Sequence, residues 1–346
     1  MTTLLLSGLA VTAAVCASLT AAVIPLLRRA RVVDVPGDRS LHRTPVPRGG
    51  GLAIVLAASL ATWTAVLAAV HLQGAVHAMS GVDVALMGLA TVLAFALLGL
   101  IEDLFSVSVR TRLVLQLVLG AGLGLVAHSA FEVSLWWTPA ICVGTAALVN
   151  ATNFMDGANG LACGHALLTS LWYVQVAAVA PVAGLGLVMV SVAGACLGFL
   201  PFNTPRAKVF LGDSGSYALG SAWAFAVTAC LSRGVAVEAA LAPVLVLLAD
   251  TGYTLWMRLR AGQCWYAPHR LHVYQRLVCA GWPHWASALL VTLAAAACSA
   301  LAAGSLLTSN RLWMPQVAMA AVLIVYLKMP SIIGAPNPFP TLRRAR

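Results

Sequence analysis

The stretch Asn-Ala-Thr-Asn-Phe-Met-Asp-Gly-Ala-Asn-Gly-Leu, residues 150–161, lies between two apolar runs that are each long enough to cross a membrane. Its first seven residues carry two carboxamides and a carboxylate. A membrane protein keeps such groups at the hydrocarbon boundary only where something satisfies their hydrogen-bonding capacity. We therefore expect apolar helices on both sides of this stretch and a polar centre where they meet.

The rest of the chain is too apolar for a soluble domain. Of its 346 residues, 61% are hydrophobic and only 9% are charged, whereas soluble domains carry about 25% charged residues. The expected fold is an all-α polytopic integral membrane protein. At about 20 apolar residues per crossing, about eleven transmembrane helices are predicted at 4–27, 50–71, 82–101, 112–128, 135–150, 162–180, 182–200, 215–231, 238–257, 286–306 and 312–328.

The basic residues predict the orientation of these helices. Eighteen of the twenty Lys and Arg residues fall at one side of the predicted bundle, and only Arg233 and Arg311 fall at the other. Because cytoplasmic loops carry the excess of basic residues, we expect a periplasmic N-terminus and a cytoplasmic C-terminus. The cytoplasmic loops are then about 28–49, 102–111, 151–161, 201–214 and 258–285. This distribution accounts for the net charge of +10, so no nucleic-acid partner is expected.

Acidic residues gather on the same predicted side, which holds seven of the ten. Glu102 and Asp103 are adjacent, and the repulsion between neighbouring carboxylates is offset most directly by a bound cation. Asp156 and Asp213 add further oxygens on this side. Magnesium takes one or two carboxylates together with phosphate oxygens, so these acids predict a Mg²⁺ site without requiring each of them as a ligand.

Each polar group also has a purely structural explanation. Asp156 and Asp213 each precede a predicted helix and could act as N-caps. The cluster at 269–276 could be a basic loop lying on anionic lipid headgroups. Asp250 lies inside the predicted helix 238–257 and could hydrogen-bond a neighbouring helix. The presence of all of them on one side favours a ligand site over these separate explanations.

The motifs, taken in chain order, resemble those of a known superfamily. They are Pro-Arg-Gly-Gly-Gly at 47–51, Glu-Asp at 102–103, the polar stretch 150–161, Phe-Asn-x-Pro at 202–205 with Leu-Gly-Asp-Ser-Gly-Ser at 211–216, and the histidine-rich loop at 269–276. Together they resemble the polyprenyl-phosphate N-acetylhexosamine-1-phosphate transferases, of glycosyltransferase family 4 type, over about residues 25–285. Segments 34–42 and 269–276 look most like the branch that starts lipopolysaccharide O-antigen synthesis.

The resemblance implies a single transmembrane catalytic domain spanning 1–346, in the bacterial cytoplasmic (inner) membrane. Such an enzyme would transfer N-acetylhexosamine 1-phosphate from a UDP-sugar to undecaprenyl phosphate and release UMP. It would use Mg²⁺, with Mn²⁺ as a substitute, in contact with membrane lipids. Direct displacement and a two-step route through an aspartyl-phosphate both stay open, as do a homodimer and the donor sugar: N-acetylglucosamine, N-acetylfucosamine, or N-acetylquinovosamine and its 4-amino derivative.

Carried onto this sequence, the resemblance implies roles for individual residues. The expected catalytic residues are Glu102, Asp103, Asp156, His269 and His272. The expected substrate-binding residues are Arg48, Asn153, Asn159, Asn203, Arg276 and Asp250. The expected metal ligands are Asp213 and Asp103. The chain differs from the superfamily pattern at two of these positions, because Glu102 stands where an aspartate is usual and Asn159 stands where many members have an acid.

Two other classes of protein fit part of the pattern. A secondary transporter for an anionic substrate would also be polytopic with polar breaks between helices. It would, however, place charges near the bilayer midplane and show repeat symmetry, whereas the charges here gather at one face. A non-catalytic pathway scaffold would explain the two departures but not the retention of Asp103, Asp156 and Asp213.

Overall fold

The computed structural model describes residues 2–37, 41–42, 44–73, 75–105, 107–180, 182–264, 266–267, 269–306 and 313–336. Each predicted membrane segment is helical in the part of the chain described. The helices are α1 (Thr2–Arg29), α2 (Gly51–Gln73), α3 (Ala75–Phe105), α4 (Val109–Phe131), α5 (Thr138–Phe154), α6 (Leu161–Val179), α7 (Leu185–Asn203), α8 (Gly212–Ser232), α9 (Val237–Leu241), α10 (Leu245–Arg260), α12 (His284–Ala302) and α13 (Met314–Ile332). Three short 3-10 turns accompany them, at Leu135–Trp137, Ala242–Val244 and Ala303–Leu306. The all-α polytopic membrane fold is thus confirmed.

Nine segments within the described residues are long and apolar enough to cross a membrane, with α9 and α10 counted as one. The other two predicted segments are α5, which is only 17 residues long, and α8. Helix α8 is buried almost without interruption from Ser214 to Cys230 and packs against α2, α3, α4, α5, α6 and α7. Because protein rather than lipid surrounds it, α8 does not need a strongly apolar surface.

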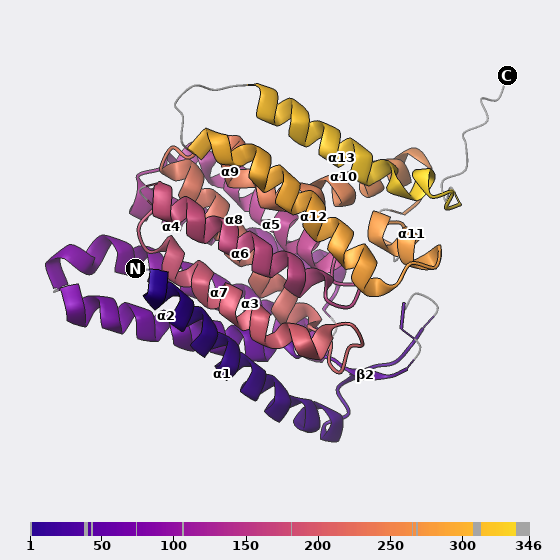
Figure 1. Ribbon diagram of the computed structural model, residues 1–346, viewed down its shortest axis with the longest axis horizontal. Helices are drawn as coiled ribbons and strands as arrows, with labels where there is room; N and C mark the ends of the chain where they lie inside the picture. The colour runs from indigo at the N-terminus through magenta and orange to yellow at the C-terminus, as the bar shows by residue number, and fades with distance from the viewer. Residues whose placement is uncertain are drawn as a thin grey trace.

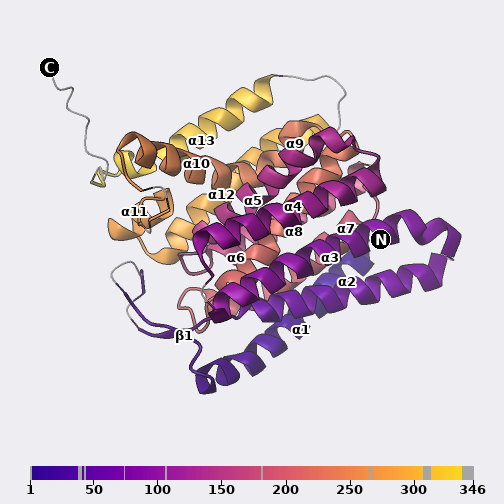
Figure 2. The same ribbon diagram turned by 180° about the vertical axis from the view of Figure 1, so that it is seen from behind.

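Successive long helices run in alternating directions, as Figures 1 and 2 show. Helices α3, α5 and α7 end where α2, α6 and α8 begin, so all the predicted polar loops meet at one end of the bundle. Helix α1 starts at the opposite end, and α13 finishes at the polar end. An odd number of crossings predicts this separation of the two termini.

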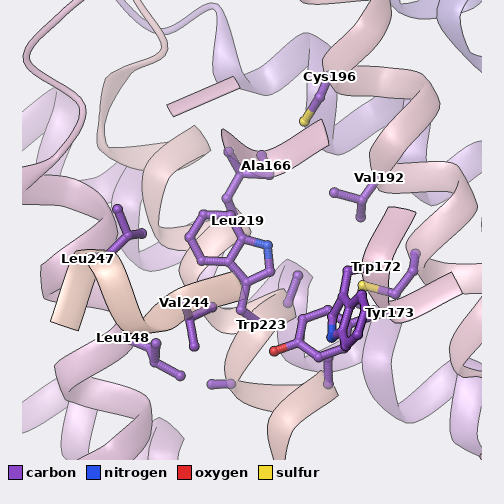
Figure 3. Close-up of a cluster of buried hydrophobic side chains, with 14 of the residues drawn as sticks. Leu148, Ala166, Trp172, Tyr173, Val192, Cys196, Leu219, Trp223, Val244 and Leu247 are labelled. Carbon is purple, nitrogen blue, oxygen red and sulfur yellow. The ribbon is translucent and has the colours of Figure 1, made fainter. Parts of the chain in front are cut away.

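The predicted segment 238–257 corresponds to one membrane-spanning segment, Val237–Arg260, in which a 3-10 turn breaks the α-helix between α9 and α10. Pro243 lies at the break and has no N–H to donate. Side chains of α6 satisfy carbonyl groups there: Trp172 Nε1 and the Tyr173 hydroxyl donate to two carbonyls of α9 over 2.9 and 2.8 Å, and His165 Nε2 lies 2.8 Å from the Pro243 carbonyl. Figure 3 shows this packing around Trp223 of α8. The break is therefore a fixed part of the core.

Two features of the polar end were not predicted. A two-stranded antiparallel hairpin, β1 (Val33–Asp34) and β2 (Val46–Pro47), precedes α2, and a short helix, α11 (Val273–Cys279), lies inside the expected loop 258–285. The chain after β2 runs parallel to the chain before α8, where Arg48 and Phe210 form a bridge. A Cβ at Gly51 would clash with the backbone of Gly215. The glycines of these two motifs therefore permit the backbone contact that brings Arg48 to α8.

Candidate active site

A polar cavity of about 660 Å³ lies at the end of the bundle that carries the hairpin segment and α11. Its walls come from the hairpin segment, the α5–α6 loop, the α7–α8 loop, α11 and the start of α12. The predicted site residues that line it are Arg48, Asn153, Asp156, Asn159, Asn203 and Asp213. Arg48 and Asp213, which are 165 positions apart in the sequence, thus share one cavity.

Arg48 bridges two of the predicted carboxylates. Its Nε lies 3.0 Å from Oδ1 of Asp103, and its Nη2 lies 2.7 Å from Oδ2 of Asp213. Burial lowers the pKa of this guanidinium, but Asp213, Asp103 and Asp34 more than offset that effect, so the pKa is raised overall. Arg48 is therefore a permanent cation that compensates two acids whose side chains are only 4% and 14% exposed.

Asp103 has a structural task that the sequence did not reveal. Its two oxygens accept hydrogen bonds from the backbone N–H groups of Asp213 and Ser214, over 3.0 and 2.9 Å. These amides belong to the first turn of α8, which has no other side-chain cap among the described contacts. Asp103 thus supplies the carboxylate that a helix N-terminus favours. A role for Asp103 as a metal ligand stays a prediction.

Asn153 orients Asp213 toward the cavity. The Nδ2 of Asn153 donates to Oδ1 of Asp213 over 2.7 Å and lies 3.0 Å from Oγ of Ser216. Since Arg48 holds the other oxygen, both oxygens of Asp213 have a defined direction. Asp213 lies in the first turn of α8 and is not its N-cap. The N-cap explanation of this residue is therefore wrong.

Asp156 lines the cavity from the α5–α6 loop. Helix α6 is capped by Gly160, without a side-chain cap, so Asp156 is not an N-cap either. Burial raises the pKa of Asp156 well above its usual range, the nearby Asp213 raises it further, and Arg48 opposes the shift. A cation or a cationic ligand in the cavity would relieve the cost of ionising this carboxyl.

Two asparagines brace the loops that form the cavity. Asn203 accepts a hydrogen bond from the Gly160 amide over 2.7 Å and donates to the Val209 carbonyl over 3.0 Å. Asn159 donates through Nδ2 to the Pro205 carbonyl over 3.2 Å. An aspartate at position 159 could not donate this hydrogen bond when ionised. The departure at this position therefore has a structural reason.

Glu102 points to a different set of partners. Its Oε1 lies 3.1 Å from Nη1 of Arg112 at the start of α4, and its Oε2 is buried without a hydrogen-bond partner in the described structure. Glu102 is not among the residues that line the cavity. It thus lies outside the cavity lining and next to a cation, and its Oε2 has no partner among the described residues.

The two histidines of the loop at 269–276 are not in the cavity lining, although Gln275 of the same loop is. His272 is 3% exposed, and its Nδ1 lies 3.0 Å from Oδ1 of the fully buried Asp250. This burial contradicts the explanation of His272 as part of a loop on lipid headgroups. The ring of His269 lies 5.0 Å from that of His272, centroid to centroid, and is tilted by 45° to it. Burial, followed by His272 and Arg258, lowers the pKa of His269 to about 4, so it is neutral at pH 7.

Two predicted substrate contacts differ in their surroundings from what we expected. Asp250 is 0% exposed, and both of its oxygens accept hydrogen bonds from protein groups. This leaves no open face through which Asp250 could make the substrate contact that we expected. Arg276 donates through Nη2 to the Pro336 carbonyl over 3.2 Å and is not in the cavity lining. Direct contact of these two residues with a substrate therefore has no support in this geometry.

Magnesium fits this site only when a bound ligand supplies further oxygens. Among the residues that the structure describes, no group of three or more His, Cys, Asp or Glu side chains is placed to hold a metal ion. Asp156 and Asp213 nevertheless both line the cavity, and the charge of Asp213 contributes to the raised pKa of Asp156. Two carboxylates completed by phosphate oxygens are an ordinary magnesium environment. The donor set thus suits a metal that arrives with a phosphate group.

Several lining residues had no role in the sequence-based prediction. Phe210, Gln275 and His284 line the cavity, together with Asp34 and His42 of the hairpin segment. Asp34 and His42 belong to the motif at 34–42, so a signal was present for them. Position 284 carried no signal, because a single histidine at the start of an apolar helix is not distinctive.

Known proteins are similar to this chain over most of its length. Glycosyl transferase family 4 matches residues 85–231. The decaprenyl-phosphate N-acetylglucosaminephosphotransferase of Mycobacterium leprae is 31% identical over 307 residues, which cover 78% of this chain and 75% of the relative. The probable undecaprenyl-phosphate N-acetylglucosaminyl 1-phosphate transferase of Bacillus subtilis is 27% identical over 290 residues, covering 78% and 77%. A phospho-N-acetylmuramoyl-pentapeptide-transferase of Desulforudis audaxviator is 32% identical over 235 residues, covering 57% and 68%.

The apolar helices, the polar cavity at one end and these relatives define a multi-pass transferase of the bacterial inner membrane. The chain belongs to glycosyl transferase family 4, within the polyprenyl-phosphate N-acetylhexosamine-1-phosphate transferase superfamily. The superfamily expected from the motifs is thereby confirmed.

Proposed function

We propose that this protein transfers N-acetylhexosamine 1-phosphate from a UDP-sugar to undecaprenyl phosphate and releases UMP. The observation that carries the proposal is the convergence of Arg48, Asn153, Asp156 and Asp213 in one cavity at the end of a membrane bundle. A phosphoryl-transfer site needs fixed positive charge, oriented carboxylates and a position at the membrane surface, where a lipid phosphate can arrive.

In the proposed reaction, an oxygen of the lipid phosphate attacks the β-phosphorus of the donor, which carries the sugar. The bond from this phosphorus to the bridging oxygen breaks, and the bridging oxygen leaves with UMP. If the lipid phosphate carries a proton, that proton must be removed as the new bond forms. Since the chemistry requires positioning and charge neutralisation more than covalent help, we favour direct displacement over an aspartyl-phosphate intermediate.

The cavity residues divide into two tasks in this proposal. Arg48 and Asn153 hold the Asp213 carboxylate in one orientation, and Arg48 also neutralises charge beside the donor diphosphate. Asn159 and Asn203 hold the α5–α6 and α7–α8 loops in contact, which fixes the width of the cavity for the donor. A displacement of about 1 Å in such a frame would cost a large factor in rate.

Glu102 is the proposed base on the acceptor side. Its Oε2 lacks a partner and it lies next to Arg112, whose charge would attract the lipid phosphate. The exposed apolar residues of α4, such as Val114 and Val118, face the lipid phase. The acceptor would thus reach Glu102 from the membrane side, while the donor occupies the aqueous cavity.

Asp156 and Asp213 would hold Mg²⁺ together with the donor diphosphate, and Mn²⁺ would substitute for it. When bound there, the metal supplies charge neutralisation for the departing UMP. Both carboxyls line the cavity. The raised pKa of Asp156 is expected of a buried carboxyl whose ionised form a bound cation would stabilise.

UDP-N-acetylglucosamine is the first donor to test, because two of the relatives named above carry N-acetylglucosamine in their names. The other N-acetylhexosamines differ by a hydroxyl group or its orientation, and pocket hydrogen bonds discriminate such differences. We further propose a place for the reaction at the start of O-antigen or related envelope polysaccharide synthesis, on the motif similarity at 34–42 and 269–276.

The proposal is tested by UMP release from the purified protein in detergent. The assay contains undecaprenyl phosphate, Mg²⁺ and one UDP-N-acetylhexosamine at a time, with EDTA and lipid-free reactions alongside. We expect release that requires the lipid and the metal and that falls more than about 100-fold in Asp213→Asn. Ser232→Ala, at the far end of α8, should retain full activity. Folded, lipid-binding protein that releases no UMP from any donor would refute the proposal and favour the scaffold hypothesis.

A further inference from the structure

Asp250 joins three helices at one buried point. Its Oδ2 accepts a hydrogen bond from the Tyr326 hydroxyl of α13 over 2.7 Å and from the Val273 amide over 3.0 Å. Its Oδ1 lies 3.0 Å from Nδ1 of His272. Val273 is the first residue of α11, so a carboxylate of α10 binds the N-terminus of α11 as well as a side chain of the last helix.

This arrangement is unusually well satisfied for an acid within a membrane helix. Asp250, His272 and Tyr326 are 0%, 3% and 2% exposed, and Thr254 adds a fourth donor to Asp250 over 3.2 Å. A buried carboxylate is costly unless it is paired and hydrogen-bonded. The donors therefore compensate it only while α10, α11 and α13 keep their present positions.

Helix α11 connects the hydrogen bonds of Asp250 to the wall of the cavity. The hydroxyl of Tyr274, the next residue along, donates to the Phe154 carbonyl at the end of α5 over 2.9 Å. A Cβ at Gly157 would clash with the same hydroxyl, so the loop that carries Asp156 packs directly on Tyr274. Gln275 lines the cavity itself and also caps the backbone N–H of His272 over 3.2 Å.

We propose that Tyr326 and Asp250 are positioning residues, which set the affinity for the donor by holding α11 against the loop between α5 and α6. The inference rests on the proposed function, because that loop carries Asp156 at the donor diphosphate. The inference assigns α13 a role in donor binding as well as in membrane anchoring, through its contacts with α10, α11 and α12. The path runs from Tyr326 through Asp250 and the start of α11 to Tyr274 and Phe154.

The test compares Tyr326→Phe with Tyr173→Phe. Both tyrosines are buried, and each hydroxyl donates one hydrogen bond to a neighbouring helix, but the hydrogen bond of Tyr173 goes to the Ala240 carbonyl of α9. We measure KM for UDP-N-acetylglucosamine, KM for undecaprenyl phosphate, and the Kd of UMP by calorimetry on the full protein in detergent. Since a hydrogen bond to a charged group is strong, we expect Tyr326→Phe to raise the donor KM and the UMP Kd about fivefold, with the lipid KM unchanged.

Tyr274→Phe tests the other end of the path and should raise the same two constants. Because both changes act through one path, the Tyr326→Phe, Tyr274→Phe double variant should fall short of the product of the two single effects. Tyr173→Phe combined with Tyr274→Phe should show no such coupling. If Tyr326→Phe does not fold, the nearly isosteric Thr254→Val takes its place, with an expected increase of about threefold from the loss of a weaker donor.

The inference is overturned if Tyr326→Phe behaves as Tyr173→Phe does, if it changes only the lipid KM, or if the double variant is additive. These outcomes differ from a failure of the proposed function, in which the unchanged protein releases no UMP from any donor. UMP binding is measured directly, so the comparison does not depend on turnover.

Discussion

Arg48 offers the sharpest test of the site, because its two nitrogens hold two different carboxylates. Nε lies 3.0 Å from Asp103, and Nη2 lies 2.7 Å from Asp213. Arg48→Lys keeps the charge, but a single ammonium cannot reproduce the two directions of the guanidinium fork. One charge-assisted hydrogen bond should therefore be lost.

The size of the effect follows from the exposure of the side chain. A hydrogen bond to a charged group contributes about 1.5–3 kcal/mol, and Arg48 is 38% exposed, so the lower end of that range applies. About 1.5 kcal/mol corresponds to a loss of roughly tenfold in kcat/KM for Arg48→Lys. Arg48→Ala removes both hydrogen bonds and leaves two acids uncompensated, so we expect roughly 100-fold or more.

The assay is the initial rate of UMP release at donor concentrations below KM, with thermal unfolding in the same detergent as a check on folding. Arg206→Lys and Arg206→Ala are the matched controls, because Arg206 is exposed at the same end of the bundle and has no place in the cavity lining. Full activity of Arg48→Lys would refute the bridging role, since charge alone would then suffice. Equal losses in Arg48→Lys and Arg48→Ala would show that the geometry matters and the charge does not.

Three further changes test separate parts of the structure. Burial and Asp213 raise the pKa of Asp156, so its ionisation destabilises the folded state once the pH exceeds the ordinary value of about 4. Without divalent cations, Asp156→Asn should therefore raise the unfolding temperature at pH 7.5 and lose this advantage below pH about 4, while UMP release falls; lower stability at every pH would contradict this. Asn159→Asp loses its donor to the Pro205 carbonyl and should raise the donor KM about fivefold, whereas an unchanged KM would show that this contact does not shape the cavity. A reporter fused after Arg346 should behave as cytoplasmic, and a periplasmic signal would overturn the eleven-crossing topology.

Much of the fold and part of the site could be predicted from local sequence. Long apolar runs have few alternatives in a bilayer, because a spanning segment must satisfy its backbone within a helix. The predicted segments accordingly coincide with helices, and the 3-10 turn at Pro243, inside one of these segments, was not predicted. Arg48, Asn153 and Asp213 were singled out because their motifs combine glycine with polar groups at helix ends, which a membrane protein otherwise avoids. The structure brings them to one cavity, and their roles stay predictions.

The prediction was less accurate for residues whose role depends on distant partners. Asp250 was expected to bind substrate, because an acid in a membrane helix suggests a ligand. Its partners Tyr326 and Val273 lie 76 and 23 positions away, and no local pattern indicates that they meet. Asp103 likewise gained its capping role only through contact with α8, which begins more than a hundred positions later in the chain.

The sequence by itself determined the class of protein, the membrane segments and the set of polar residues that share one end of the bundle, because hydrophobic length and charge distribution act locally. The tertiary structure alone decided which of these residues face the cavity and which hold its walls in place. The role of each residue depends on hydrogen bonds over a few ångströms, and these form only where packing brings the helices together. Asp213 and Asp250, two acids in neighbouring parts of one chain, thereby acquire different tasks: the first is directed into the cavity, and the second is enclosed by the helices that it joins.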